Sequence, residues 1–439
     1  MISQYIFAAT LLLTIVVFGY TSWRYIKLFR LTRPAFPVKD IGKRILLTIN
    51  VALAQSKMFR KPFSGIMHAL VFWGFLVILI GSIEMVIDGL TGIERSLKFM
   101  GVFYDLLMAS GDVFALIVAI AIIVFIGRRL FIHVKRFEGI EMNRVSHIDA
   151  KVALSLILLL MLTLLGINTS YVAHQTAMNL PIYGFFPVSN HLTGLVSGLS
   201  QHAQHVHHEV HWWAHILLIF FFANLLPYSK HFHVFMSVPN VFLSRLDPLG
   251  KLPNMDNITR EVKLMLDPAT AFSPAGADTP PERFGIKDAE DLSWKNYLDA
   301  LACTECGRCT SVCPASLTGK KLSPRKIVMD LRARMREKAK GLLISGKDYS
   351  DNKSLLRQYI SEEELWACTT CNACAMECPI NINHPTIIVD MRRYLVMEEG
   401  SAPGELKAVF NNIENNGAPW QYSAQDRLLW AKDLEIKKS

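Results

Sequence analysis

Two cysteine blocks constrain this chain more than any other feature of its sequence. They read CTECGRCTSVCP at 303–314 and CTTCNACAMECP at 368–379, so each repeats Cys-x-x-Cys-x-x-Cys-x-x-x-Cys-Pro. Bacterial-type ferredoxins use this spacing to hold two [4Fe–4S] clusters, and the fourth cysteine of each block binds the other cluster. The spacing therefore predicts two clusters with crossed ligands. One takes Cys303, Cys306, Cys309 and Cys378, and the other takes Cys368, Cys371, Cys374 and Cys313.

Two other uses of cysteine fit this pattern poorly. Zinc needs four ligands in one tetrahedron, which explains neither the third cysteine of each block nor the proline after the fourth. Disulfides staple loops in small secreted domains, whereas these cysteines are crowded into two short runs. All eight cysteines of the chain belong to the two blocks.

The net charge of +9 does not indicate nucleic-acid binding. Residues 250–439 carry 26 Lys and Arg and 26 Asp and Glu, so this part is neutral. Residues 1–249 carry 20 Lys and Arg and 11 Asp and Glu, and the long apolar runs lie there as well. Basic loops beside apolar spans set membrane topology, which accounts for the excess.

Five apolar segments are long enough to cross a bilayer, which takes roughly 20 residues each. They lie at about 4–23, 64–87, 105–127, 150–173 and 211–229. The first has no basic residues before it and no small-residue cleavage site after it, so we expect a retained helix and not a signal peptide.

The loops between these segments alternate in charge. Ten Lys and Arg lie between the first two segments, two in the next loop and five in the third, whereas 174–229 contains none. The positive-inside rule then places the N-terminus outside and the cysteine blocks in the cytoplasm. We expect a multi-pass protein of a bacterial or archaeal cytoplasmic membrane, in contact with lipid.

Two loops carry further patterns. Segment 39–59 has apolar residues at helical spacing with basic flanks, which fits either an amphipathic helix on the inner membrane surface or a short helix packed on the C-terminal domain. The outer loop 174–210 is rich in histidine. Such tracts can bind metal, but without acidic or cysteine partners a polar outer loop is the simpler interpretation.

Three histidines lie in or beside the spans, where an ionisable residue is a candidate for function. His68 lies near the cytoplasmic start of the second span, and His215 and His233 flank the fifth. If they share one helix, eighteen residues make five turns and put His215 and His233 on one face, roughly 27 Å apart. His68 and His233 then lie at the same depth, as expected for the two axial ligands of a b-type haem. The alternative is a set of hydrogen-bonded core or headgroup histidines.

At the outer end of the bundle the sequence leaves more than one interpretation open. His215 has no histidine opposite it in the second span, where Ile78 lies at the matching depth. It could hold a second haem with another outer histidine such as His174, or help to bind a quinone. Glu84 and Asp88 could handle quinone protons, or they could be ordinary solvated residues at a helix end.

After residue 245 the composition changes to that of a soluble protein. Residues 246–292 are rich in Pro, Asp and Gly and predict a linker, 293–398 a dicluster ferredoxin domain and 399–439 a tail for docking a partner. Helices are expected at 293–302 behind a Ser cap, at 324–340 and at 385–397. The predicted fold is therefore all-α, a five-helix transmembrane bundle (1–245) followed by an α-helical ferredoxin domain.

The spans resemble the cytochrome b subunit of respiratory nitrate reductase and the membrane subunits of heterodisulfide-reductase-like complexes. Gly65-x-x-His68, Phe-Trp-Gly-Phe at 72–75, the stretch from His208 to His215, and Pro-Tyr-Ser-Lys at 227–230 before His233 carry this resemblance. It implies haem ligation by His68 and His233. The nitrate reductase subunit has a histidine pair on each of its second and fifth spans, and here the second-span pair is reduced to His68.

The C-terminal part resembles the ferredoxin portion of heterodisulfide reductase and of the glycerol-3-phosphate dehydrogenase iron–sulfur subunit. The carrying residues are Cys-Thr-Thr-Cys at 368–371, Cys-Pro-Ile at 378–380, His384, Asp-Met-Arg-Arg at 390–393, and 412–420 with Trp430. In those relatives a Cys-Cys-Gly domain follows, whereas this sequence stops at Ser439. We therefore expect a separate subunit, either one that carries that domain or a dehydrogenase or flavoprotein.

These patterns predict a membrane electron-transfer subunit. It would pass electrons between menaquinone or ubiquinone, a b-type haem, two [4Fe–4S] clusters and a soluble partner. The alternative is a membrane-anchored iron–sulfur sensor or docking subunit without quinone turnover.

Overall fold

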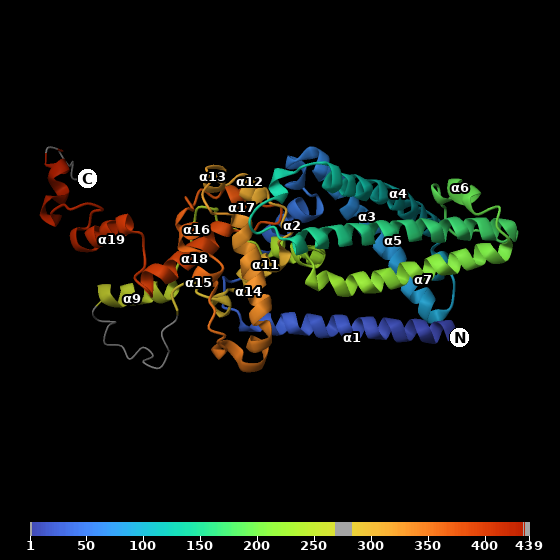
Figure 1. Cartoon of the computed structure of the whole chain (residues 1–439), viewed down its shortest axis with the longest axis horizontal. Coiled ribbons are helices and arrows are strands. Elements are labelled where there is room, and N and C mark those ends of the chain that lie inside the picture. The colour runs from blue at the N-terminus through green and yellow to red at the C-terminus, as the bar shows by residue number, and fades with distance from the viewer. Residues whose placement is uncertain (1, 268–282, 433, 435–439) are drawn as a thin grey trace.

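The computed structural model describes residues 2–267, 283–432 and 434. Within these residues the chain is helical and contains no β-strand, only two isolated bridges, between Arg33 and Ser293 and between Leu356 and Ile360. Long helices form one end of an elongated molecule and shorter helices form the other (Figure 1). The predicted all-α fold, with five long apolar helices ahead of a helical C-terminal region, is confirmed.

The five long apolar helices coincide with the five predicted spans. They are α1 (Ile2–Leu31), α3 (Pro62–Thr91), α4 (Val102–Phe131), α5 (Arg144–Ala177) and α7 (Gln201–Leu225). Four of them extend beyond both ends of the predicted apolar segment, whereas α7 begins ten residues earlier than predicted and ends at Leu225, before Pro227. The 30 residues of α1 span about 45 Å, more than the roughly 30 Å of hydrocarbon in a bilayer.

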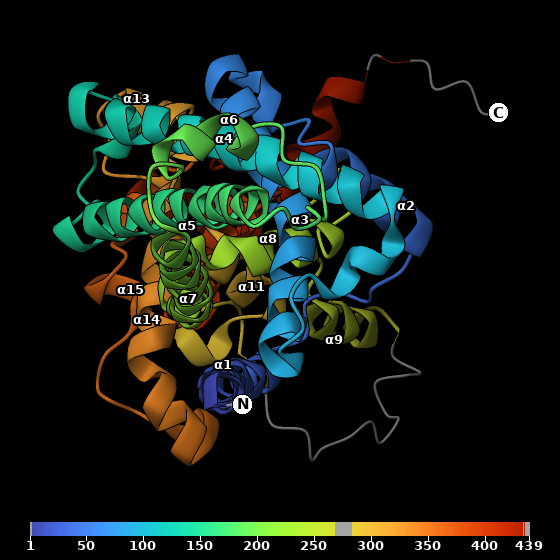
Figure 2. The same ribbon diagram turned by 90° about the vertical axis from the view of Figure 1, so that its right-hand side faces the viewer.

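Small residues let the helices of the bundle approach one another. Ala115 and Ala119 of α4 are buried in the core that α4 shares with α5. Gly74 of α3 faces Val118, and an added Cβ would stand only 2.7 Å from the Val118 Cγ2 atom. Membrane helices commonly pack through such small residues. Seen along the long axis, α1 lies at the edge of the bundle (Figure 2), where its Leu12 side chain is 63% exposed.

The predicted outer loop 174–210 is shorter than the sequence indicated. Helix α5 continues to Ala177, and α7 begins at Gln201 behind Ser200, whose hydroxyl oxygen accepts from the Ala203 N–H at 3.2 Å. His202 and the following histidines therefore lie on α7 and not in a loop. The segment between the two helices contains α6 (Ser189–Leu192) and the 3-10 helix η5 (Thr193–Leu195).

The expectation that His215 and His233 share one helix is wrong. Pro227 fixes its φ and lacks an N–H, which favours a break after α7. Two 3-10 turns follow, η6 (Leu226–Tyr228) and η7 (Lys230–Phe232), separated by the extended residue Ser229. His233 then begins a separate helix, α8 (His233–Phe242).

Segment 39–59 is divided among several short helices. These are α2 (Ile41–Thr48), the π-helix η1 (Ile49–Leu53) and the 3-10 helix η2 (Met58–Arg60). One face of α2 packs on α8, where the buried Arg44 guanidinium donates to the carbonyl oxygens of Phe242 and Ser244. The apolar side chains of Ile45 and Leu46 on α2 remain exposed. The segment thus combines a packed face with an apolar face that is free to meet lipid.

Short helices build the C-terminal region around one apolar core. They are α11 (Trp294–Ala302), α12 (Arg308–Ser311), α13 (Pro314–Leu317), α14 (Pro324–Ser345), α15 (Leu355–Gln358), α16 (Glu362–Trp366), α17 (Ala373–Glu377) and α18 (His384–Met397). Ser293 caps α11 as expected, since its hydroxyl accepts from the Asn296 N–H at 3.2 Å. The core includes Leu331 and Ile387, and it extends to Leu28 at the end of α1.

The remaining helices include connecting turns and the helices near the C-terminus. They are η3 (Ser96–Met100), η4 (Lys135–Phe137), α9 (Asp256–Leu266), η8 (Ala289–Asp291), η9 (Gly346–Asp348), α19 (Gly404–Asn416) and η10 (Ala424–Ala431). One of them, η8, contributes the buried Ala289 to the C-terminal core. Helix α9 lies in the predicted linker, of which 268–282 falls outside the described residues. Helices α19 and η10 bury no side chain among their described residues. Helix α19 lies at the end of the molecule away from the long helices (Figure 1), and 433 and 435–439 of the predicted tail are not described.

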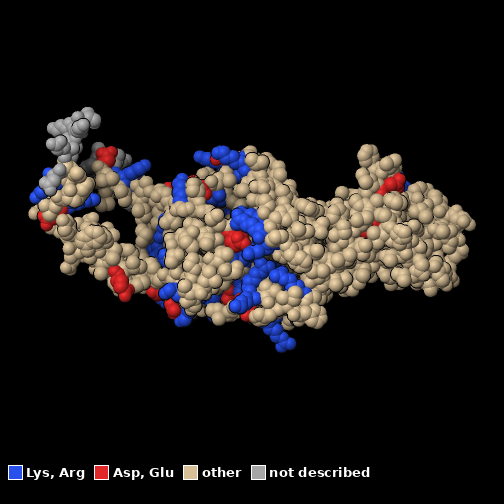
Figure 3. Space-filling view, turned by 90° about the horizontal axis from the view of Figure 1, so that it is seen from above, with Lys and Arg blue, Asp and Glu red and all other residues tan. Residues whose placement is uncertain are grey.

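Lys and Arg side chains gather where the long helices meet the C-terminal region (Figure 3). Several of them donate across the junction to main-chain oxygens. The Arg60 guanidinium donates to the Met376 oxygen at 2.7 Å, and the Arg325 guanidinium to the Arg136 oxygen at 2.6 Å. These bonds join the C-terminal region directly to the membrane part.

A buried ion-pair network stabilises the C-terminal region. Arg334 is fully buried and donates to both carboxylate oxygens of Asp288 and of Asp351, each at 2.7 Å. Removing one member of such a network leaves a buried charge without its partner, which costs about 3–5 kcal/mol. We therefore expect Arg334→Met to lower the thermal midpoint of the C-terminal region, measured by hydrogen exchange of α11 and α14 during heating.

The exposed pair of Lys321 and Glu363 provides the control. Because both side chains are solvated, Lys321→Met should change the midpoint little. Equal effects of the two substitutions would show that the buried network contributes nothing special.

Candidate redox sites

The two cysteine blocks adopt the same backbone course. In each block the first cysteine follows a helix, α11 or α16, the third lies in a short helix, α12 or α17, and the fourth follows that helix. Glu305 and Gly307 have positive φ in the first block, and Thr370 and Asn372 have positive φ at the same positions in the second. A left-handed conformation costs roughly 1–2 kcal/mol at a non-glycine residue. Its repetition indicates that both loops need the same turn.

The eight thiols fall into two groups. Burial first, and then the neighbouring Cys306 and Cys303 thiolates, raise the pKa of Cys378 to about 12. Burial, and then Cys368, Cys313 and Cys371, raise the pKa of Cys374 to about 12.

The fourth cysteine of each block therefore lies beside the first three of the other block. This neighbourhood is compatible with the crossed membership, and the assignment of each ligand stays a prediction. Here the first thiol group means Cys303, Cys306, Cys309 and Cys378, and the second thiol group means Cys368, Cys371, Cys374 and Cys313.

The donor chemistry of both groups fits iron–sulfur clusters. The raised pKa values show that a buried thiolate needs a nearby cation, which the irons of a cluster supply. Main-chain N–H groups of Thr370 and Ile382 point at the sulfurs of Cys368 and Cys378, each at 3.4 Å. Such N–H···S bonds are part of cluster binding. A cavity of about 320 Å³ borders all four cysteines of the second thiol group.

A single metal ion would need a different arrangement. Among the described residues, no group of three or more His, Cys, Asp or Glu side chains comes close enough to hold one ion. A cubane cluster binds one thiolate at each of its four irons, so its ligands need not converge on one point.

His68 and His233 meet at the end of the bundle that faces the C-terminal region. Their ring centroids are 6.4 Å apart, and the ring planes are inclined by 34°. The Nδ1 atom of His233 lies 3.2 Å from the Lys230 oxygen, an arrangement in which Nδ1 donates and Nε2 is left free as a ligand. The buried Nδ1 of His68 has no hydrogen-bond partner among the described residues.

The spacing of these two rings suits a metal ion between them. Two histidine–metal bonds of about 2 Å each, plus roughly 1 Å from each nitrogen to its ring centre, sum to about 6 Å. His231 lies beside His233, with the ring centroids 5.8 Å apart, because η7 is a 3-10 turn and ends where α8 begins.

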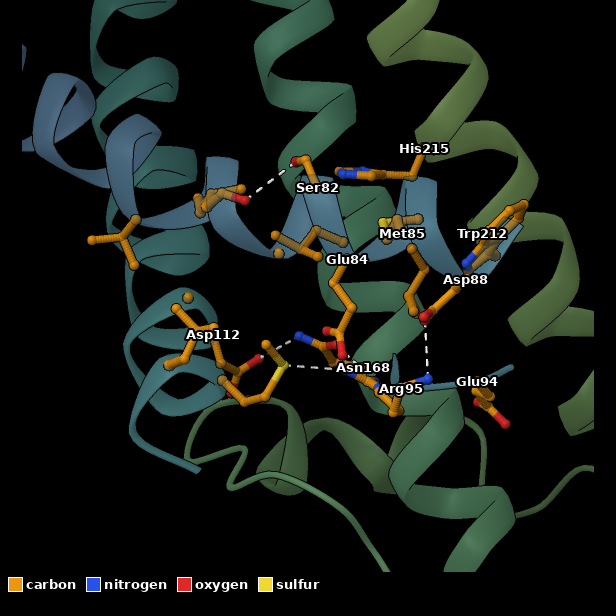
Figure 4. A pocket seen from close by; sticks show the side chains of 18 of the residues that line it. Ser82, Glu84, Met85, Asp88, Glu94, Arg95, Asp112, Asn168, Trp212 and His215 are labelled. Atoms are coloured by element: carbon orange, nitrogen blue, oxygen red, sulfur yellow. Dashed lines mark hydrogen bonds between the residues drawn. The ribbon is translucent and has the colours of Figure 1, made fainter. Parts of the chain in front are cut away.

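His215 lies in a separate pocket of about 690 Å³ near the other end of the bundle. Its Nδ1 atom is 2.8 Å from the Thr163 hydroxyl, and its ring projects toward Ser82 in the view of Figure 4. Ile78, which the sequence placed opposite His215, also lines the pocket. The further polar residues of the lining are Glu84, Asp88, Glu94, Arg95, Asp112, Asn168 and His208.

Several of these polar groups are held in place by hydrogen bonds from neighbouring residues. Glu84 is buried and accepts from the Leu97 N–H at 3.0 Å and the Tyr104 hydroxyl at 3.2 Å, so a solvated helix end does not describe it. Asp112 is fully buried and accepts from the Ser189 N–H at 2.9 Å. The sequence reasoning missed Asp112, although an acidic residue within an apolar span is itself a signal.

Four further histidines of α5 and α7 form two pairs. The ring centroids of His174 and His205 are 5.7 Å apart, and those of His207 and His211 are 4.1 Å apart. His174 is therefore not paired with His215, as a second haem built on these two residues would require.

The region around the cysteines matches a family model described as a 4Fe-4S dicluster domain, over residues 299–382. Two long relatives cover most of the chain. The probable iron-sulfur-binding oxidoreductase FadF of Bacillus subtilis is 30% identical over 88% of this chain and 55% of its own length. The EtfAB:quinone oxidoreductase of Syntrophomonas wolfei is 28% identical over 99% of this chain and 60% of its own length.

The chain thus spans little more than half the length of these curated relatives. The position of its last residue therefore says nothing about where a Cys-Cys-Gly domain lies. The predicted resemblance to heterodisulfide reductase is found over a shorter stretch. One component of the dihydromethanophenazine:CoB–CoM heterodisulfide reductase of Methanosarcina barkeri is 28% identical over 34% of this chain and 37% of its own length.

No solved structure matches the chain. None of the three relatives is named as a cytochrome b, so that part of the resemblance stays a prediction. The matching proteins are iron–sulfur oxidoreductases or components of them, and the dicluster model supports two 4Fe–4S clusters here. Five of the described helices are long and apolar enough to cross a bilayer, so the chain is a membrane protein with a 4Fe–4S dicluster region.

Proposed function

We propose that this chain carries electrons between a membrane quinone and a soluble redox partner. The eight cysteines hold two [4Fe–4S] clusters with crossed ligands, and His68 and His233 hold one b-type haem. The observation that carries the proposal is the sequence of sites along the long axis. The histidine pair lies at the inner end of the bundle, and the two thiol groups follow it in the C-terminal region.

Contacts at the junction support this order. The Lys57 ammonium, in the loop before α3, donates to the Cys378 oxygen at 3.2 Å, and Arg308 of the first block donates to the Lys57 oxygen at 2.9 Å. The first thiol group therefore borders the membrane part. In the second thiol group Cys371 is exposed, which makes this group the one open to a partner.

A bound haem supplies a one-electron carrier between a two-electron quinone and the clusters. The protein's own part is to hold and orient that carrier, and the Lys230 main chain does so by fixing the Nδ1 atom of His233. Ring orientation set by a main-chain bond of this kind is a common feature of histidine ligands.

The pocket at His215 is the proposed quinone site. It combines apolar walls with a few polar groups, as ligand pockets usually do. The Nδ1 atom of His215 faces Thr163, which leaves the other ring nitrogen to meet a quinone oxygen. Both menaquinone and ubiquinone offer such an oxygen.

In this arrangement residues 1–245 form the membrane domain, 246–292 a linker, 293–398 the ferredoxin domain and 399–439 a tail for docking the partner. The N-terminus is outside and the ferredoxin domain faces the cytoplasm. The name of the Syntrophomonas relative, EtfAB:quinone oxidoreductase, supports an electron-transfer flavoprotein as the soluble partner.

The test is reduction of the full-length protein in lipid nanodiscs by short-chain menaquinol and ubiquinol under anaerobic conditions. We expect one or both quinols to bleach the iron–sulfur absorbance and to produce a reduced b-type α-band. If the clusters stay oxidised with both quinols but reduce with dithionite, the sensor or docking role replaces electron transfer.

Substitution of His215 tests the position of the quinone site. We expect His215→Ala to slow quinol-driven reduction roughly tenfold, the effect of losing one hydrogen bond of about 1.5 kcal/mol, while dithionite reduction is unchanged. His202→Ala, at an exposed position of the same helix, is the control. Equal rates in the two variants would remove His215 from the quinone site.

A further inference from the structure

Lys230 connects the two parts of the molecule through both its main chain and its side chain. It lies in η7, just after the break in the fifth span, and is only 7% exposed. Its N–H donates to Asp149 of α5 at 3.0 Å, and its carbonyl oxygen accepts from the Nδ1 atom of His233. The main chain of Lys230 thus orients His233, one member of the histidine pair.

The side chain of Lys230 reaches into the first cysteine block. Its ammonium is 2.9 Å from Glu305 Oε2 and donates to the Ser146 oxygen at 2.5 Å. Glu305 lies between Cys303 and Cys306 and has a positive φ of 57°. A glutamate at such a position carries backbone strain that a glycine would avoid, so its side chain must compensate through these contacts.

Arg332 of α14 completes the arrangement. Its guanidinium pairs with the other oxygen of the Glu305 carboxylate and donates to the Cys303 main-chain oxygen at 2.9 Å. Lys230, Glu305 and Arg332 are all buried, with 6–7% of each residue exposed. We call these three residues the junction triad.

The charges of the junction triad do not balance. Within the triad two cations face one carboxylate, so the three side chains together carry one net positive charge beside the first thiol group. A buried charge is costly unless an opposite charge lies close by. The four thiolates of the first thiol group and the cluster they would hold carry negative charge close to the triad. Charge and hydrogen bonding around a cluster set its reduction potential.

We propose that the junction triad sets the reduction potential of the cluster held by the first thiol group, with Lys230 and Arg332 raising it and Glu305 lowering it. One-electron reduction adds one negative charge to that cluster and forms or breaks no bond. A nearby cation therefore favours the reduced state, and a nearby anion disfavours it. This inference rests on the proposed function for the cluster itself, but it assigns new roles to three residues that are not ligands.

The experiment is a potentiometric titration of the full-length protein, followed by electron paramagnetic resonance of the reduced clusters. We expect Lys230→Gln to shift one of the two cluster potentials downward and Glu305→Gln to shift the same one upward. The double variant keeps one net positive charge, as in the parent, so its potential should return toward the parent value. The other cluster should not move.

Two control variants separate charge from structure. Lys230→Arg keeps the charge and should restore the parent potential. Lys338→Gln removes a buried lysine that pairs with Asp288 at 2.9 Å and Glu290 at 2.6 Å instead of with the junction triad, and should leave both potentials unchanged. The b-type α-band should persist in all of these variants, because the bond to His233 comes from the main chain of Lys230.

Shifts of the same sign in Lys230→Gln and Glu305→Gln, or no shift in either, would overturn the inference. If one of these variants fails to take up iron, Arg332→Gln provides the second measurement, since it removes the other cation and must also lower the potential. Failure of the proposed function looks different, because the parent protein would then show no cluster signal or no reduction by quinol.

Discussion

A chain in which Cys306 and Cys378 are both replaced by alanine should keep one iron–sulfur cluster. A chain that instead loses Cys306 and Cys374 should keep none. In the crossed arrangement the first pair serves one cluster, whereas the second pair removes one ligand from each. Iron should therefore fall from about eight per chain to about four in the first variant and to nearly none in the second.

The two double variants are matched controls for each other, because each removes one thiol from each block. Iron and acid-labile sulfide per purified chain are the measurements, with the spectrum of the reduced protein to identify the surviving cluster. If each block bound its own cluster, both variants would lose both clusters. Equal iron content in the two variants would therefore contradict the crossed assignment.

The cysteine arrangement was accessible from the sequence because the spacing of a cluster block is a local property. Three cysteines within seven residues must lie close together in any fold, and the role of the fourth follows from the repeat. The apolar spans were equally accessible, since about 20 apolar residues in a row have few other uses. The ends of the helices could not be predicted in this way. Helix α7, for example, begins at Gln201 because Ser200 caps it there.

The candidate sites within the membrane part were predicted less completely. The pocket around His215 draws on four helices and the segment from Glu94 to Arg95, so no local pattern contains it.

The junction triad lay beyond sequence reasoning for the same reason. Lys230 and Glu305 are 75 residues apart, and each looks unremarkable in its own segment. Only the packing of the C-terminal region against the end of the bundle buries them together. Long-range pairs of buried charges are the part of a site that spacing and periodicity do not encode.

His233→Ala should abolish the b-type absorption of the protein and leave the iron–sulfur clusters in place. Loss of one axial imidazole leaves a low-spin haem without its second strong ligand, and His68→Ala should have the same effect from the other side. The measurement is the reduced-minus-oxidised spectrum of the purified protein, with iron and sulfide content to show that both clusters remain.

His231→Ala is the matched control, because its ring centroid lies only 5.8 Å from that of His233 and it belongs to the same turn of the chain. Its Nδ1 atom faces the Ser229 hydroxyl at 3.2 Å and not the Lys230 oxygen that orients His233. We therefore expect His231→Ala to retain the band. If His231→Ala loses the band and His233→Ala keeps it, the inner ligand is His231. The break in the fifth span would then have moved the ligand two residues toward α7, and the 6.4 Å spacing of His68 and His233 would reflect packing alone.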